Sequence, residues 1–270
     1  MNTQDITMTE RRAAAYKLLA DCYQVPDHEV LEKFGMLKEL LAELHIHPDS
    51  TTSGVGDLPD PALSSREANC PDPASSGMVT DHPDSKLLNE NVDELKVDHA
   101  RLFIGPFSLL APPYGSMHLD TTEHLMTEST IQVQQWYASE GMEIDIPEVP
   151  DHIRIELEFM YYLVFREQHA SGFSKTDCDS LAIDGEPNGN DPGGNTSATD
   201  SMPVSDRYGR ESQYRNKQKN FLEQNLVRWI PSFTEKAAKH ARTPFYRELA
   251  NMTCRFIKVD YEYLCSQHSH

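Results

Sequence analysis

The stretch of sequence that decides the fold lies just beyond the middle of the chain and reads "PDHIRIELEFMYYLVFREQHA", residues 150–170. Its apolar residues return every three or four positions, at Ile153, Leu157, Met160, Tyr161 and Val164. This spacing is the period of one face of an α-helix, whereas a half-buried strand alternates every second residue. The stretch therefore predicts a helix that opens just after Pro150.

The same period dominates the N-terminal part of the chain. Thr7 and Glu10 have the spacing of a capping box, which predicts the start of an amphipathic first helix. Asp27 is placed to cap a second helix, whose apolar stripe consists of Val30, Phe34, Leu37, Leu41 and Leu44. Gly105-Pro106 stops a further helix, with the stripe Leu88, Val92, Leu95, His99 and Leu102.

Helices are also predicted toward the C-terminus. One spans Thr127 to Ser139 and is closed by Gly141. A later helical face consists of Leu222, Leu226, Trp229, Ile230 and Phe233. Thr243 as a cap, followed by proline at the first helical position, opens a last helix with the stripe Leu249, Met252, Phe256, Val259 and Tyr263.

Two segments lack any period. Residues 46–84 contain six prolines and many small polar residues, and residues 172–206 are rich in Gly, Asn, Asp and Ser. Such compositions are typical of disordered, low-complexity insertions. The remainder predicts an all-α fold: one domain over residues 1–270, built as a single bundle of about seven or more helices, with two long insertions.

The charge of the chain restricts its partners. There are 43 acidic and 24 basic residues, a formal net charge of −19. Such a chain repels nucleic-acid phosphates and anionic lipid, and it attracts cationic groups. A basic peptide is the natural candidate.

Cysteine usage and the N-terminal segment indicate the compartment. The five cysteines form no CxxC pair, so neither a zinc ribbon nor a disulfide framework is predicted. Arg11-Arg12 precedes an apolar stretch and mimics a twin-arginine export signal, but Lys17 and Asp21 interrupt that stretch. No apolar run approaches the ~18 residues that a membrane span requires. We expect a cytoplasmic protein.

A proline-broken apolar segment, "LFIGPFSLLAPPYGS", covers residues 102–116. Its prolines cannot donate backbone hydrogen bonds, and its apolar side chains must be covered by something. Leu102, Phe103 and Leu109 fit an ordered crossover that covers the core. Other residues of the same loop would then line a groove for an apolar helix or an extended peptide.

A second segment, "EVPDHIRIELEF", places Asp151 and His152 at a helix start. A carboxylate there is suited to bidentate pairing with an arginine. The alternative is that Asp151 only caps its helix and His152 packs inside.

Candidates for catalysis are few. His152 and Glu156 lie four residues apart on one helix face and could offer two metal ligands, with His118 or His124 as the nearest third ligand in sequence. The chain has no Walker signature, no GxGxxG turn and no GxSxG elbow. We therefore predict no catalytic residue, no bound metal and no cofactor.

Taken together, several segments resemble the TorD/DmsD/NarJ family of redox enzyme maturation chaperones. The resemblance rests on "DHARLFIGP" (98–106), "APPYGSMHLD" (111–120), "ESTIQVQQWYASEGMEID" (128–145), "EVPDHIRIELEFMYYL" (148–163) and "WIPSFTEKAAKHARTPFYRELANMTCRFI" (229–257). Two positions depart from the family pattern. His99 stands where the family usually has an aromatic residue, and the family's Glu-Pro-x-Asp-His box appears here as Glu148-Val149-Pro150-Asp151-His152.

The resemblance implies an all-helical cytoplasmic chaperone rather than an enzyme. Family members bind the catalytic subunit of a molybdoenzyme, often through its twin-arginine signal peptide, until molybdopterin is inserted. The resemblance leaves a homodimer open. In this hypothesis Asp151 pairs with an arginine of the signal peptide, assisted by His152. The client-binding residues would be His99, Leu102, Phe103, Pro113, Tyr114, Glu148, Asp151 and His152.

If His152 titrates, client affinity depends on pH in the range where histidine changes charge. Two other functions stay open on the sequence alone. One is a metal-dependent hydrolase that uses His152 and Glu156. The other is a general helical interaction module without an export client.

Overall fold

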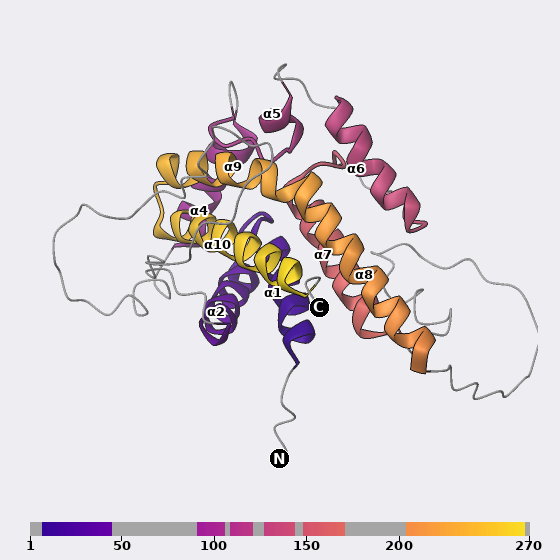
Figure 1. Ribbon diagram of the computed structural model, residues 1–270. Helices are drawn as coiled ribbons and strands as arrows, with labels where there is room; N and C mark the ends of the chain where they lie inside the picture. The colour runs from indigo at the N-terminus through magenta and orange to yellow at the C-terminus, as the bar shows by residue number, and fades with distance from the viewer. Residues whose placement is uncertain are drawn as a thin grey trace, which may run out of the picture.

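The structure, a computed structural model, describes residues 7–44, 91–105, 109–120, 127–143, 148–170 and 204–267. Within these ranges the protein is all-α, as predicted (Figure 1). The insertion expected at 46–84 lies outside the described residues. So does the one at 172–206, except that its last three residues already belong to a helix. The elements are α1 (Met8–Cys22), α2 (His28–Glu43), α4 (Val92–His99), the π-helix η1 (Ala100–Ile104), α5 (Ser116–Leu119), α6 (Glu128–Ser139), α7 (Ile153–Gln168), α8 (Val204–Gln224), α9 (Leu226–His240) and α10 (Pro244–Ser266).

Most helix ends are fixed by local chemistry that the sequence displays. The Thr7 and Glu10 side chains form the predicted capping box at the start of α1. The Asp27 carboxylate accepts the backbone N–H of Val30 at 2.9 Å and caps α2. Gly141 has a φ of 74°, a left-handed conformation that glycine adopts without steric cost, just after α6.

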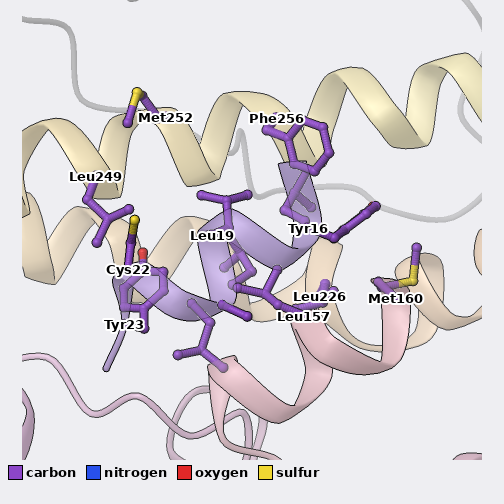
Figure 2. Packing of buried hydrophobic residues seen from close by; sticks show 14 of the residues in the cluster. Tyr16, Leu19, Cys22, Tyr23, Leu157, Met160, Leu226, Leu249, Met252 and Phe256 are labelled. Atoms are coloured by element: carbon purple, nitrogen blue, oxygen red, sulfur yellow. The ribbon is translucent and has the colours of Figure 1, made fainter. Parts of the chain in front are cut away.

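Helix α7 lies at the centre of the bundle, between α1 and α8 (Figure 1). Four residues of its predicted stripe are fully buried, and only Tyr161 is partly exposed. In Figure 2, Tyr16 and Leu19 of α1 point into the space between α7 and α10. The Tyr16 ring meets Phe256 of α10 edge to face, with centroids 4.8 Å apart. The helix predicted from the opening stretch thus supplies one wall of the core.

The stripe predicted for α10 is buried at Leu249, Met252 and Phe256. The prediction is wrong for Val259, which is 41% exposed. The buried face of α10 instead passes through Asp260. A helical pattern of apolar residues does not predict an acidic residue in the core. Asp260 is nevertheless buried, with only 3% of its surface exposed.

A buried ion-pair network, which we call the Arg12 network, explains why Asp260 is inside. The Arg12 guanidinium of α1 donates to both oxygens of Asp260 and, at 2.7 Å, to the side chain of Gln218 in α8. It also lies 3.5 Å from the carboxylate of Glu167 in α7. The Tyr16 hydroxyl donates to Asp260 at 2.6 Å. Four helices therefore meet at one buried arginine, part of the pair that mimics an export signal.

Two helix boundaries differ from what the sequence pattern suggests. The face from Leu222 to Phe233 is buried throughout, but the backbone breaks at Asn225, where the orange helices α8 and α9 meet at an angle (Figure 1). The segment before Gly105 ends as a π-helix, in which the Gly105 N–H reaches back to the carbonyl of Ala100. Neither change is signalled by local periodicity.

None of the helices that the structure describes is both long and apolar enough to cross a bilayer.

Candidate functional site

The loop Leu109–Ser116 and the start of α7 form one structural unit. Tyr114 and His152 make an isolated antiparallel bridge. The Gly115 N–H donates to the carbonyl of Asp151 at 2.9 Å, and the Ile153 N–H donates to the carbonyl of Pro113 at 2.8 Å. The two segments that the sequence singled out separately are thus joined through their backbones.

Asp151 fastens this unit from the inside. Its side chain is fully buried, and Oδ2 accepts the backbone N–H of Ser116, the first residue of α5, at 2.6 Å. Oδ1 is also buried and has no hydrogen-bond partner within the described ranges. The cap of α7 is His152 instead, whose Nδ1 accepts the N–H of Arg154 at 3.2 Å. Asp151 therefore holds the loop and is not exposed to a peptide in this conformation.

The accessible edge of the unit consists of Tyr114, Glu148 and His152, which are all half-buried. The Tyr114 hydroxyl donates to Oε1 of Glu148 at 3.3 Å. The rings of Tyr114 and His152 meet edge to face with centroids 5.2 Å apart. Burial, together with the charge of Glu148, raises the pKa of Tyr114 to about 12. The edge thus presents a carboxylate beside an aromatic hydroxyl and an imidazole.

His152 is neutral near pH 7. Burial lowers its pKa to about 4, although the carboxylates of Glu148 and Asp151 oppose this effect. His152 therefore changes charge well below the range in which an unperturbed histidine does so. Burial overrides the usual titration range of histidine.

The other predicted client-binding residues are interior. Leu102 is fully buried, and Phe103 packs on Tyr246 with ring centroids 5.4 Å apart. His99 fills the position of the family's aromatic residue and meets Phe103 edge to face at 5.2 Å. Pro113 is buried as well.

This aromatic core adjoins the loop, because the Ala111 N–H donates to the carbonyl of Leu102 at 3.0 Å. Leu102, Phe103 and His99 therefore support the loop from behind and line no open groove in this conformation. Leu109 is partly exposed and does not belong to the buried core.

Three residues that the sequence did not assign to client binding complete the unit. Trp229 of α9 is fully buried and donates its Nε1–H to Oε2 of Glu156 at 3.3 Å. His118 stacks on Trp229 with centroids 5.6 Å apart. A Cβ atom at Gly115 would lie 3.2 Å from both Oε1 of Glu156 and Nε1 of Trp229. Gly115 and His118 occur in the "APPYGSMHLD" motif, but nothing in the sequence connects that motif to Trp229.

The geometry does not favour a metal centre. The His152 Nδ1 is occupied by its capping bond, and Glu156 faces Trp229. The ring nitrogens of His118 lie 2.8 Å from the Pro112 carbonyl and 3.1 Å from the Ser232 hydroxyl. Across the described part of the chain, no three His, Cys, Asp or Glu side chains are grouped to hold a metal. His124, the other third-ligand candidate, lies outside the described residues.

Comparison with known proteins gives consistent matches. The family model "Nitrate reductase delta subunit" matches residues 78–181. A "Chaperone protein TorD" of Vibrio parahaemolyticus is 22% identical over 176 residues, which are 64% of this chain and 66% of that protein. The "Tat proofreading chaperone DmsD" of Salmonella typhimurium is 35% identical over 71 residues, 26% of this chain and 35% of that protein.

A solved structure of a candidate redox enzyme maturation protein from Archaeoglobus fulgidus aligns over 98% of this chain and 97% of the other. The two chains are 14% identical, and the TM-score is 0.41. The matched region spans about two thirds of the length of the TorD relative from Vibrio parahaemolyticus.

The family resemblance seen in the motifs is confirmed by these matches. The relatives are named as chaperones and not as enzymes, in agreement with the absence of a recognisable catalytic motif. The part of the chain that matches the family model includes the loop Leu109–Ser116 and α7. Backbone hydrogen bonds connect this loop to the start of α7. Over these segments the chain is similar to the TorD-like family of redox enzyme maturation chaperones.

Proposed function

We propose that this protein is a cytoplasmic chaperone for the catalytic subunit of a molybdoenzyme. It binds the immature subunit, in part through a twin-arginine signal peptide, until molybdopterin is inserted. Relatives named TorD chaperone and DmsD Tat proofreading chaperone support this proposal. The molybdoenzyme client follows from the family resemblance of the motifs.

One observation carries the proposal for the peptide. Glu148 presents a half-buried carboxylate directly beside the Tyr114 ring, at the edge where two separate segments are joined. A guanidinium pairs with a carboxylate through two parallel hydrogen bonds and also stacks on aromatic rings. The net charge of −19 attracts a cationic segment to this surface. The edge therefore fits an arginine.

This arrangement changes the roles that the sequence suggested. In our proposal Glu148 pairs with an arginine of the signal peptide, because Asp151 is fully buried. Tyr114 flanks the guanidinium, and the neutral His152 hydrogen-bonds the peptide. Asp151 holds the loop from within, through the Ser116 N–H.

Substituting Glu148 tests the proposal. A synthetic peptide with two arginines followed by an apolar stretch is titrated against the protein by calorimetry. Glu148→Gln should weaken binding by about tenfold or more, because a charge-assisted hydrogen bond contributes about 1.5–3 kcal/mol. Replacing both arginines of the peptide by lysine should weaken binding of the wild-type protein similarly, because lysine cannot form the bidentate fork.

Glu143→Gln is the matched control, because Glu143 is an exposed acid shortly before Glu148 in the sequence. It removes the same charge from the molecule and should leave affinity within about twofold. Equal losses in the two variants would mean that only net charge matters. Equal affinities for the arginine and lysine peptides would contradict the proposal.

A further inference from the structure

The carboxyl group of Glu156 is buried without a cation. The side chain is fully buried, and its Oε2 accepts the Trp229 Nε1–H at 3.3 Å. The other oxygen, Oε1, is buried and has no hydrogen-bond partner among the described residues. A single neutral donor therefore serves one of the two carboxyl oxygens, and the other has none among the described residues.

No positive charge in the surroundings compensates Glu156 within the described ranges. Lys17 of α1 and Arg154 of α7 both pair with Glu158, and Arg215 of α8 pairs with Glu167. The other titratable groups that face Glu156 add no positive charge. They are the carboxylate of Asp151 in the turn before α7 and the phenol of Tyr137 in α6. His118 of α5 stacks on Trp229, and burial lowers its pKa to about 4.

An ionised carboxylate in such a place is costly, because taking an unpaired charge out of water costs several kcal/mol. The group avoids this cost by binding a proton. We infer that Glu156 is a protonated, neutral carboxylic acid in the folded protein and that in this form it positions the loop Leu109–Ser116.

The contact with Gly115 connects the proton to the loop. The loop backbone approaches so closely that a Cβ atom at Gly115 would lie 3.2 Å from Glu156 Oε1. A neutral acid tolerates this dry contact, whereas a carboxylate draws in water and separates the loop from α7. Glu156 therefore acts on the Tyr114–Glu148 edge through the loop, as a positioning residue.

The pKa of Glu156 is consistent with this inference. Burial raises it well above 4.5, and the charge of Asp151 raises it further, while the Trp229 hydrogen bond opposes both. The acid keeps its proton in the folded protein and loses it near pH 4.5 in the unfolded chain. The stability that the proton contributes is complete below pH 4.5 and is lost as the pH rises through the folded pKa.

Equilibrium urea unfolding of wild type and Glu156→Gln between pH 5.5 and 8.5 tests the inference. Glutamine is neutral and has nearly the same shape. Unfolding of the wild type releases one proton that the variant does not have. The ratio of the unfolding constants, wild type over variant, should therefore rise tenfold per pH unit below the folded pKa. A ratio that stays constant across this range overturns the inference.

Glu158→Gln is the matched control on the same helix, because Glu158 is partly exposed and ion-paired. The ratio of the unfolding constants of wild type and Glu158→Gln should not change with pH. Protonation can also be observed directly, from the infrared carbonyl band of a carboxylic acid at pH 7, which should be present in wild type and absent in Glu156→Gln.

If Glu156→Gln does not fold, the wild-type side chains still decide the question. In a Trp136→Phe background, Trp229 is the one remaining tryptophan, and its indole reports on Glu156. Its emission should then change in one step as Glu156 ionises, at a pH above the ordinary range of a glutamate. A flat emission profile together with no carboxylic acid band at pH 7 overturns the inference. These measurements use no client, so they stand apart from the proposed function.

Discussion

At the residue scale, Gly115 is required by a contact and not by its backbone angle. Its φ of −57° and ψ of −42° are open to any residue. A methyl group there, however, would press on Glu156 and Trp229, both fully buried, at 3.2 Å. The closeness of the loop to α7 therefore depends on the missing side chain.

Gly115→Ala should lower the free energy of unfolding by about 1–3 kcal/mol, the usual cost of overpacking. It should also weaken binding of the twin-arginine peptide, because the loop carrying Tyr114 moves. Urea unfolding and calorimetry measure the two effects. Gly35→Ala in α2 is the control, since a Cβ there meets nothing within 4 Å. It should stabilise the protein by about 0.5–1 kcal/mol, and a loss at both positions would argue against the contact.

The exposure of single residues was the weakest part of the sequence prediction. The motifs identified Tyr114, Glu148, Asp151 and His152 as neighbours in function, and the backbone places them together. Which of them face outward depends on partners far away in sequence. Glu156, for example, is buried by Trp229, 73 positions further along the chain.

At the scale of elements, the features that the sequence predicts correctly are helix ends that depend on neighbouring residues. The capping box at Thr7, the Asp27 cap and the proline at the start of α10 all follow from neighbouring residues. The break at Asn225 has no local signal, because its apolar stripe continues through it. Long-range packing decides such breaks.

Asp98 of α4 makes a long-range contact between two helical elements. Its Oδ2 accepts the N–H groups of Arg242 and Thr243 at 2.9 and 2.8 Å, and the Thr243 hydroxyl at 2.9 Å. Thr243 makes no capping bond with its own side chain. The acid of α4 therefore fixes the two residues that lead into α10, across 145 residues of sequence. Burial alone would raise the pKa of Asp98, but these bonds lower it.

Asp98→Ala should cost about 2–3 kcal/mol in urea unfolding, because the donors just before α10 lose their buried acceptor. Asp98→Asn should cost less, since the amide oxygen still accepts. Asp93→Ala is the control, because Asp93 is exposed on the same helix and lies 3.9 Å from Lys96. It should change stability by less than about 0.5 kcal/mol. Equal effects of the two alanine variants would contradict a stabilising role for the bonds between Asp98 and the residues that lead into α10.

At the scale of the whole molecule, the Arg12 network joins α1, α7, α8 and α10 at one buried point. Arg215 of α8 adds a second cation by pairing with Glu167. The twin arginines of α1 are therefore divided between two roles. Arg12 ties the bundle together, whereas Arg11 pairs with the more exposed Glu43 at 3.7 Å.

Arg12→Met should lower the free energy of unfolding by about 3–5 kcal/mol, because it leaves the buried carboxylate of Asp260 without its cation. This is a large part of the about 5–15 kcal/mol that holds a domain together. The neighbouring substitution Arg11→Met removes the same charge and should cost at most about 1 kcal/mol. Urea unfolding of both variants in one buffer makes the comparison.

A double-mutant cycle then separates the loss of the pair from the loss of one partner. Arg12→Met alone leaves the Asp260 carboxylate buried without a cation. Combining it with Asp260→Leu removes that carboxylate as well, so the double variant should be more stable than Arg12→Met alone. Purely additive losses would show that Arg12 and Asp260 contribute independently. The bundle would then owe its assembly to apolar packing, and the buried arginine would not couple its helices.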